Sequence, residues 1–210
     1  MRQELRHGPL WRRVPDSGLQ RPTLPMSGLS GGPVGQPGMS DWDHGAMGDA
    51  EPTAQGMTAI EVHAIVEWLE TRAVVYQING GWAVDALVGH QTRPHRDLDL
   101  FVDAAAVDDI LGWLTARGYA AETDWLPARL ELRSGPLRVD LHPMVLDSNG
   151  NGVQRGLGDE LFEHSRAMRT LGVVSGRAVV VATAKRLRAL HEGYELREVD
   201  VHDLHLLADL

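Results

Sequence analysis

The sequence contains no cysteine among its 210 residues. This absence excludes a disulfide-stabilised scaffold, a thiol nucleophile and any zinc or iron–sulfur site ligated by cysteine. Long apolar runs are missing too. None approaches the roughly 20 residues that a membrane-spanning helix requires, and the N-terminus lacks the apolar segment of a secretory signal. We therefore expect a cytoplasmic protein without a membrane partner.

Basic residues are in the minority, with 20 Lys and Arg against 29 Asp and Glu and a formal net charge of −9. This balance argues against a protein that wraps nucleic acid through a basic face, so no nucleic-acid partner is expected. The P-loop and H-E-x-x-H motifs are missing as well. Their absence weakens the interpretations as a kinase or a metalloprotease.

Glycine and proline are concentrated near the N-terminus, where they occupy 17 of the first 56 positions. Such a content is typical of disordered sequence, so we predict a disordered Gly/Pro-rich extension over residues 1–56. Residues 57–210 are enough to bury a hydrophobic core without disulfides or metals, and we place the domain there. Whether the extension is genuine or reflects a misassigned start is left open.

Helical and strand patterns alternate after residue 57. A capping box from Thr58 to Glu61 begins the first helix, and the Ser134-Gly135-Pro136 turn predicts a hairpin. The other expected elements are helices over 82–88, 104–116 and from Asp159, Thr183 and Glu198, a loop over 147–158, and strands over 74–78, 98–102, 128–133, 137–145, 171–174 and 178–182. The alternation predicts an α/β (α+β) fold with a mixed sheet, flanking helices and a helical C-terminus.

Two aspartates, Asp97 and Asp99, stand two positions apart at the start of a predicted strand. Residues at this spacing point to the same face of a strand, while Leu98 and Leu100 face the core. Two like charges held side by side are costly unless a cation binds them. Carboxylate oxygens without cysteine partners favour Mg²⁺ or Mn²⁺ over zinc.

A third carboxylate, Asp140, lies in the strand over 137–145, with Val139 and Leu141 facing the core and His142 sharing its side. If this strand neighbours 98–102, three carboxylates converge at one end of the sheet. Such an arrangement suits metal-assisted phosphoryl or nucleotidyl transfer, in which a carboxylate activates the acceptor hydroxyl.

The glycine pair Gly80-Gly81 separates a predicted strand from the helix that begins at Trp82. Glycines at such a junction let the backbone approach phosphates, and the helix directs its N–H groups and positive dipole end toward them. Each feature also has an ordinary explanation: D-x-D is common at strand ends, a glycine pair is most often a turn, and Asp140 suits a solvated strand face. Their combination in this order favours a site.

The block from Gly80 to Gly89, followed by Arg93-Pro94-His95-Arg96-Asp97-Leu98-Asp99, resembles the antibiotic nucleotidyltransferases. It is most similar to the aminoglycoside 2''-adenylyltransferase and lincosamide nucleotidyltransferase group of the polymerase-beta-type superfamily. The resemblance continues through the segments 139–143, 149–152 and 191–195, with Asp200 and Asp203 beyond. The superfamily's usual Gly-Ser is Gly-Gly here, as in this subgroup.

The resemblance implies a role for each residue of the motif. Asp97 and Asp99 would bind Mg²⁺ or Mn²⁺, and Asp140 would be a metal ligand, a general base or both. Gly80 and Gly81 would hold the triphosphate of ATP or another NTP. Arg93 and His95 would neutralise phosphate charge. An ion pair with a nearby acid such as Asp85 explains Arg93 equally well.

The expected function is Mg²⁺-dependent transfer of a nucleoside monophosphate, AMP from ATP, onto a hydroxyl of a small molecule such as an aminoglycoside or lincosamide antibiotic. The acidic balance favours a cationic acceptor. Two alternatives stay open: a toxin–antitoxin type of nucleotidyltransferase acting on protein or tRNA, and a non-catalytic nucleotide-binding domain. The sequence is compatible with a monomer or a homodimer.

Overall fold

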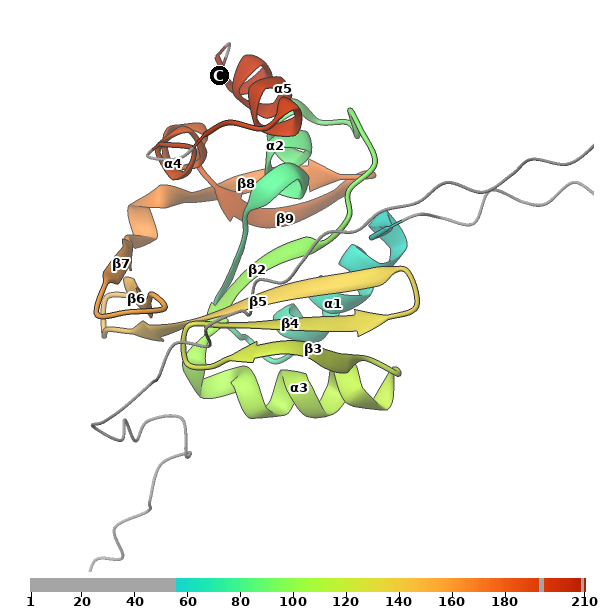
Figure 1. Ribbon diagram of the computed structural model, residues 1–210, viewed down its shortest axis with the longest axis vertical. Coiled ribbons are helices and arrows are strands. Elements are labelled where there is room, and N and C mark those ends of the chain that lie inside the picture. Colours follow the sequence, from blue (N-terminus) through green and yellow to red (C-terminus); the bar gives the residue numbers. More distant parts are fainter. Residues whose placement is uncertain (1–55, 193–194, 209) are drawn as a thin grey trace, which may run out of the picture. The chain divides into compact units, whose positions relative to one another are not determined.

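The computed structural model describes residues 56–192, 195–208 and 210, in which helices and strands alternate (Figure 1). The predicted extension over 1–56 lies outside the described residues except for Gly56, so its disorder stays a prediction. The helices are α1 (Ala59–Thr71), α2 (Gly80–Val88), α3 (Val107–Ala116), α4 (Ala184–Leu190) and α5 (Glu198–Leu207), with short 3₁₀ turns η2 (Ala104–Ala106) and η3 (Arg166–Met168). The strands are β1 (Tyr76–Ile78), β2 (Leu98–Asp103), β3 (Ala120–Trp125), β4 (Arg129–Ser134), β5 (Leu137–Leu146), β6 (Gly152–Arg155), β7 (Leu161–His164), β8 (Arg169–Val174) and β9 (Arg177–Ala182).

The strands form one mixed sheet in the order β3-β4-β5-β2-β1-β9-β8, and β6 and β7 extend from β5 as a hairpin. The pairs β2–β5 and β1–β9 are parallel, whereas the other pairs are antiparallel. The predicted mixed-sheet fold is therefore confirmed. Its central feature is the direct pairing of β2 with β5, the two strands that carry the motif aspartates.

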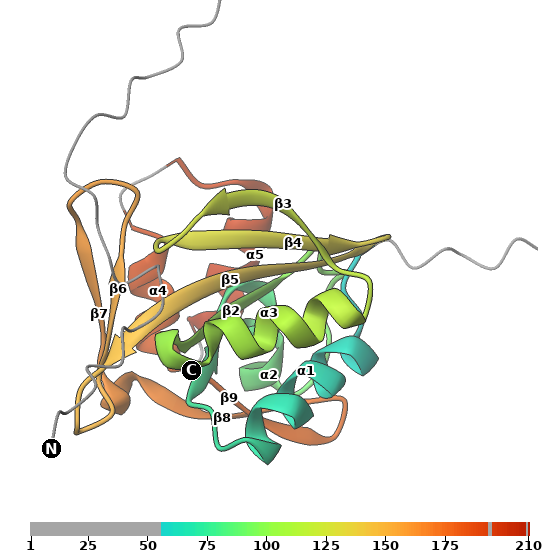
Figure 2. The same ribbon diagram turned by 90° about the horizontal axis from the view of Figure 1, so that it is seen from below.

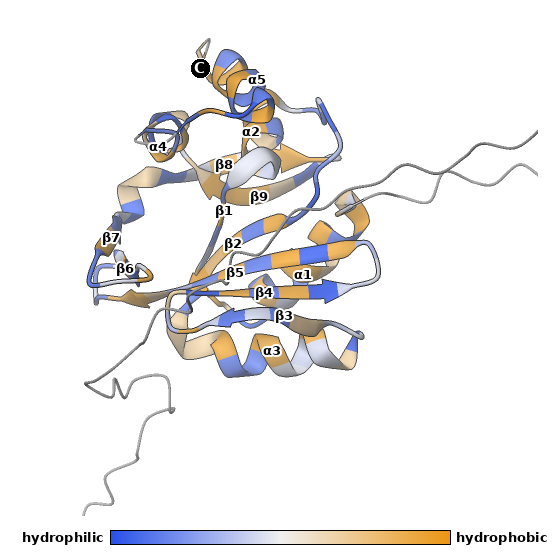
Figure 3. Ribbon diagram, in the orientation of Figure 1, coloured by the Kyte–Doolittle hydropathy of each residue, from blue (hydrophilic) through white to orange (hydrophobic). Residues whose placement is uncertain are grey.

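Helices flank the sheet in two groups (Figures 1 and 2). Helices α1 and α3 pack beside strands β2 to β5, whereas α2, α4 and α5 gather where β8 and β9 lie. In β2 and β5, apolar and polar residues alternate along the ribbon (Figure 3). Leu98, Leu100 and Leu141 are fully buried in the core, so the opposite face of both strands is left for Asp99 and Asp140.

Helix α1 begins as predicted at Thr58, whose side chain accepts a hydrogen bond from the Glu61 backbone N–H. In the expected capping box, the Glu61 side chain would in return accept from the Thr58 backbone N–H, but it binds other groups instead. The Glu61 carboxylate accepts from the Arg117 guanidinium at 2.6 Å and from the Tyr119 hydroxyl at 3.1 Å. Glu61 therefore ties α1 to the segment after α3.

Two of the sequence-based element assignments are wrong, and one strand was missed. The segment 147–158 is not all loop, because it contains β6, and the expected helix from Asp159 is the strand β7. Strand β3 was not expected at all. These strands are short or mostly exposed, so they lack the long apolar periodicity that separates a strand from a helix or loop. Helix α2 begins at Gly80 rather than Trp82, which places both glycines in its first turn.

None of the helices in the described ranges combines the length and the apolar character that crossing a bilayer would require.

Candidate active site

The parallel pairing of β2 and β5 brings two of the three motif aspartates together. Asp99 stands opposite Asp140, and Phe101 stands opposite His142. One carboxylate oxygen of Asp99, one of Asp140 and one ring nitrogen of His142 all lie within 4.8 Å of one another. Asp97 lies just before β2 on the rim of the same cavity, where it pairs with Arg96.

The two glycines are required by the close approach of other groups to the first turn of α2. Gly80 has a φ of +59°, and a Cβ built on it would lie 2.0 Å from Asp99 Oδ2. A Cβ on Gly81 would lie 2.4 Å from both Arg93 Nη2 and His95 Nδ1. The glycine pair therefore lets one carboxylate and two basic side chains pack directly on the helix N-terminus.

Asn79, the N-cap residue of α2, does not cap its helix. Its side-chain oxygen accepts a hydrogen bond of 2.8 Å from Gln77 Nε2, and both side chains are buried. Asn79 Nδ2 has no hydrogen-bond partner within the part of the chain that the structure describes. The sequence analysis missed this residue, although it lines the cavity beside Gly80.

Arg93 and His95 both lie at the glycine turn, and each is held by an aspartate. Arg93 donates to Asp203 from Nε at 3.0 Å and from Nη2 at 2.6 Å, so Asp203 rather than Asp85 is its partner. The hydrogen bonds to Asp203 raise the pKa of Arg93 further. The buried His95 ring instead contacts Asp85.

Asp85 is fixed from two sides. Burial alone would raise the pKa of its carboxyl group, but hydrogen bonds from His95 and Thr92 outweigh burial and lower it. The Trp82 ring packs on His95 with centroids 4.6 Å apart. His95 is therefore part of a buried brace in the cavity wall, and Arg93 is the more exposed of the two side chains.

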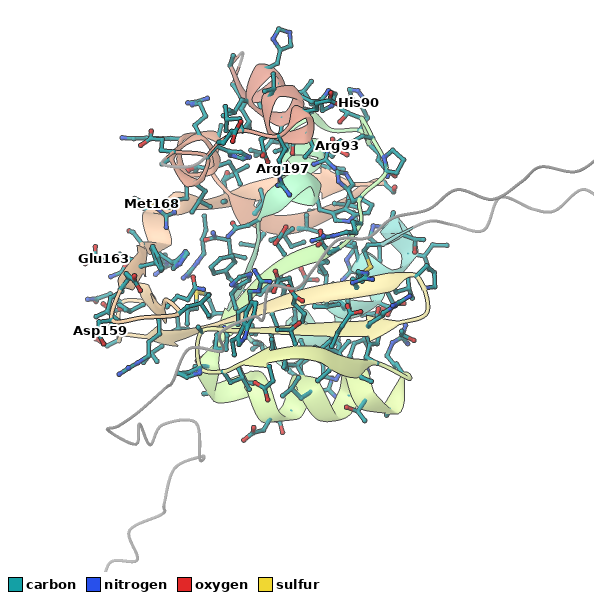
Figure 4. All side chains as sticks on the ribbon, in the orientation of Figure 1. His90, Arg93, Asp159, Glu163, Met168 and Arg197 are labelled. Atoms are coloured by element: carbon teal, nitrogen blue, oxygen red, sulfur yellow. The ribbon has the colours of Figure 1, made fainter. Side chains whose placement is uncertain are left out.

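The cavity above these groups has a volume of about 570 Å³ and is lined on its other side by residues of α4, α5 and the segment between them. Arg93 and Arg197 both lie close to α5 (Figure 4). Four of the five cavity aspartates form an ion pair with an arginine that also lines the cavity. These pairs are Asp97–Arg96, Asp140–Arg129, Asp200–Arg197 and Asp203–Arg93.

Asp99 is the exception among the cavity aspartates, since no arginine or lysine of the described residues forms an ion pair with it. Burial, and then the negative charges of Asp97 and Asp140, raise the pKa of Asp99 to about 6. Asp140 Oδ1 is buried and has no hydrogen bond in the described part of the chain. Arg129 Nε at 3.2 Å and His142 Nε2 at 3.5 Å approach it without hydrogen-bond geometry.

This donor set fits a hard divalent cation. Such ions prefer several carboxylate oxygens, and the cluster offers oxygens that are close together and incompletely satisfied. A cation would also relieve the repulsion between the charges of Asp97, Asp99 and Asp140.

Arg129 was not predicted as a site residue, and neither was the approach of His142 to the carboxylates. Arg129 reaches Asp140 from β4, where Glu131 stands opposite Asp140 and also pairs with Arg129. The alternation within 128–133 places Arg129 and Glu131 on one face. Only the register of β4 on β5 shows that this face meets Asp140, and short-range patterns do not fix that register.

Comparison with known proteins gives two sequence matches. Residues 61–207 match the family model described as aminoglycoside-2''-adenylyltransferase. The chain is also 31% identical over 157 residues to a protein of Staphylococcus haemolyticus named lincosamide resistance protein, covering 73% of this chain and 96% of that relative.

Solved structures that share the fold include the following two. The lincosamide antibiotic adenylyltransferase LnuA with bound lincomycin is 29% identical, with a TM-score of 0.67, over 73% of this chain and 98% of LnuA. ANT(2'')-Ia in complex with adenylyl-2''-tobramycin is 18% identical, with a TM-score of 0.56, over 72% of this chain and 87% of that protein. At this lower identity the second match shows a common fold only.

Proposed function

The chain belongs to the aminoglycoside-2''-adenylyltransferase family, and from this premise we propose that it transfers AMP from ATP onto a hydroxyl of a lincosamide antibiotic. Membership makes it a nucleotidyltransferase, an enzyme that uses a nucleoside triphosphate and a metal. The identity of the nucleotide, of the metal and of the acceptor are the proposed parts.

One observation carries the proposal: Asp99 and Asp140 lie opposite each other on adjacent parallel strands, directly beside the glycine N-terminus of α2. A helix N-terminus binds phosphate through its free N–H groups and dipole. The carboxylates are the ligands that Mg²⁺ prefers. A triphosphate and its metal would therefore meet within one cavity.

Asp97, Asp99 and Asp140 would hold Mg²⁺ or Mn²⁺, which supplies charge stabilisation for the phosphates and the departing pyrophosphate. Gly80 and Gly81 would receive the triphosphate. Arg93 would neutralise phosphate charge from the other side of the glycine turn, positioned by Asp203.

Asp140 is the proposed general base. It would take the proton of the acceptor hydroxyl as the hydroxyl oxygen forms a bond to the α-phosphorus of ATP. The bond from that phosphorus to the β-phosphate oxygen breaks, and pyrophosphate leaves. The adjacent Arg129 would hold the Asp140 carboxylate toward the cavity.

The charge of the cavity favours a lincosamide over an aminoglycoside as acceptor. Four of the five cavity aspartates are paired with arginines, which leaves Asp99 as the one cavity aspartate without such a pair among the described residues. An aminoglycoside carries several ammonium groups and needs several free carboxylates, whereas a lincosamide carries one basic amine. The relative above 30% identity is also a lincosamide resistance protein.

The test is pyrophosphate release by the full chain with ATP and Mg²⁺, in the presence of a lincosamide or an aminoglycoside, with mass spectrometry of the acceptor. We expect release with lincosamides and an acceptor that has gained one AMP. Asp140→Asn should abolish transfer, while Asp124→Asn, an exposed aspartate of β3, should leave the rate unchanged.

Two results would contradict the proposal. Transfer to aminoglycosides alone would overturn the acceptor assignment but keep the reaction. Metal-dependent binding of ATP with no transfer to either drug class would overturn the antibiotic as acceptor.

A further inference from the structure

The hairpin of β6 and β7 buries two polar side chains, Gln154 and His164, next to the carboxylate cluster. Their exposed fractions are only 9% and 1%, whereas Val153 and Phe162 of the same hairpin are exposed. A hairpin that points its apolar residues outward and its amide and imidazole inward is organised around those polar groups.

The orientation of the Gln154 amide is fixed by a backbone carbonyl. Gln154 Nε2 donates to the oxygen of Ala128 at 3.2 Å, and a carbonyl oxygen can only accept. The same nitrogen lies 3.0 Å from His142 Nδ1. Because an amide nitrogen has two hydrogens and no acceptor capacity, His142 Nδ1 must be the acceptor.

The state of His142 follows from this hydrogen bond. A neutral histidine that accepts at Nδ1 carries its hydrogen on Nε2, and Nε2 is the atom that lies 3.5 Å from Asp140 Oδ1. The ring cannot turn easily, because it stacks on Phe101 with centroids 4.4 Å apart and an angle of 9° between the planes.

The hydrogen bond at the oxygen of the Gln154 amide supports the same orientation of the amide group. Its Oε1 lies 3.2 Å from His164 Nε2 and must accept from it, so His164 also carries its hydrogen on Nε2. Burial, and then the charge of Arg186, lower the pKa of His164 to about 4. His164 is therefore neutral at pH 7, and its ring packs on that of Phe101, with centroids 4.6 Å apart and planes tilted by 45°.

We infer that Gln154 is a positioning residue that holds His142 in the Nε2–H tautomer, so that His142 presents an N–H to Asp140 and is not a metal ligand. A metal ligand needs a lone pair on Nε2. Supplying one would require Gln154 to turn its oxygen toward the oxygen of Ala128, which is repulsive. The cluster of Asp99, Asp140 and His142 therefore divides into two candidate ligands and one hydrogen-bond donor.

The consequence for catalysis rests on the proposed function. An N–H that approaches Oδ1 of Asp140, with Nε2 at 3.5 Å, favours one rotation of that carboxylate, and a hydrogen bond between them can form when bound substrate tightens the site. Loss of such an orienting partner commonly lowers activity about 10- to 100-fold. The tautomer itself is a property of the free protein and does not depend on any substrate.

The first experiment is ¹⁵N nuclear magnetic resonance of the full chain labelled at histidine, which distinguishes protonated from unprotonated ring nitrogens. The chain has ten histidines, so the His142 signals are assigned by their loss in His142→Asn. We expect protonated Nε2 and unprotonated Nδ1, unchanged when Mg²⁺ is added. A hydrogen on Nδ1, with or without Mg²⁺, would overturn the inference.

The second experiment uses Gln154→Glu, which keeps the shape of the side chain but replaces its donor by an acceptor. We expect His142 to gain a hydrogen on Nδ1. We also expect kcat to fall about 10- to 100-fold while the KM for ATP changes less than about twofold. The matched control is Glu163→Gln, the reverse exchange on the outer side of the same hairpin (Figure 4), which should change neither the spectrum nor kcat.

The two experiments test the tautomer of His142 independently of its effect on AMP transfer. A shifted tautomer with kcat within about twofold of wild type would show that Gln154 does not position a catalytic group. If Gln154→Glu fails to fold in thermal unfolding, the wild-type spectrum still decides the tautomer. If the wild-type chain transfers AMP to no antibiotic, the proposed function fails while the spectrum remains decisive for His142.

Discussion

The cavity has two walls that hold their aspartates in different ways. The sheet wall carries Asp99 of β2 and Asp140 of β5, and the helical wall carries Asp200 and Asp203 of α5. On the helical wall, Asp203 takes two hydrogen bonds from Arg93, at 2.6 and 3.0 Å. Asp200 takes bonds from the backbone and guanidinium of Arg197, at 2.8 to 2.9 Å. Both carboxylates are buried but fully compensated, which is how a fold keeps a buried charge at little cost.

On the sheet wall, Asp99 and Asp140 have too few hydrogen-bond and ion-pair partners. Asp99 has no arginine or lysine partner within the described ranges, and Asp140 Oδ1 has no hydrogen bond there. Carboxylates in this condition destabilise the folded state unless a cation joins them. From this difference we expect the residues of the sheet wall to carry out the chemistry. We expect the ion pairs of the helical wall to stabilise the fold and to position the cavity side chains. Substitutions on the two walls should therefore have opposite effects on stability.

The largest effect is expected from Asp99→Asn. Loss of a carboxylate proposed to hold the metal should lower kcat/KM by about 1,000-fold, equivalent to several kcal/mol of transition-state stabilisation. Removing a charge repelled by Asp97 and Asp140 should leave Tm without metal unchanged or higher. Steady-state kinetics and thermal unfolding in a chelator measure both. Asp109→Asn, on the exposed side of α3, should change neither. A lowered Tm with normal activity would reverse the roles assigned to the two walls.

The helical wall should respond in the opposite sense to Asp203→Asn. Removing one partner of a largely buried ion pair leaves Arg93 uncompensated, at a cost of about 3 kcal/mol in the free energy of unfolding. The KM for ATP should rise because Arg93 loses its position, with a smaller fall in kcat. Urea unfolding and initial rates provide the measurements. Glu122→Gln, which breaks exposed pairs with Arg133 and Arg138, should cost less than about 1 kcal/mol.

A substitution at the junction of the two walls sharpens the comparison. Gly81→Ala would place a methyl group 2.4 Å from Arg93 Nη2 and His95 Nδ1. Neither group can withdraw freely, since Asp203 holds one and Asp85 the other. We expect about a 10-fold rise in the KM for ATP and a loss of about 1–2 kcal/mol of stability from overpacking. Gly112→Ala, where a Cβ meets nothing within 4 Å, is the matched control and should stabilise α3 slightly.

The sheet wall could largely be predicted from the sequence, whereas most contacts of the helical wall could not. Asp99 and Asp140 alternate with apolar residues, and this local period fixes which face each side chain takes. The pairing of Arg93 with Asp203 joins positions 110 residues apart and depends on how α5 packs. The role of Gln154 could not be predicted for a related reason. Its strand is only four residues long, and its partners come from β5, β7 and the segment before β4.

The smallest effect concerns the pH dependence of the helical wall. The Arg197 hydrogen bonds, acting against burial, lower the pKa of Asp200 from 3.8 to about 2. A folded-state pKa below the unfolded value means that the ion pair stabilises the protein above about pH 4 and that this stabilisation is lost as the pH falls toward 2. Because Arg197 is largely exposed, we expect this ion pair to contribute only about 1 kcal/mol to the free energy of unfolding.

Urea unfolding of wild type and of Asp200→Asn measures this contribution. The two free energies of unfolding should differ by a constant amount between pH 5 and 7, and the difference should shrink between about pH 4 and 2. A difference that grows on acidification would mean that Asp200 is protonated more readily in the folded state, and the helical wall would then be as poorly compensated as the sheet wall.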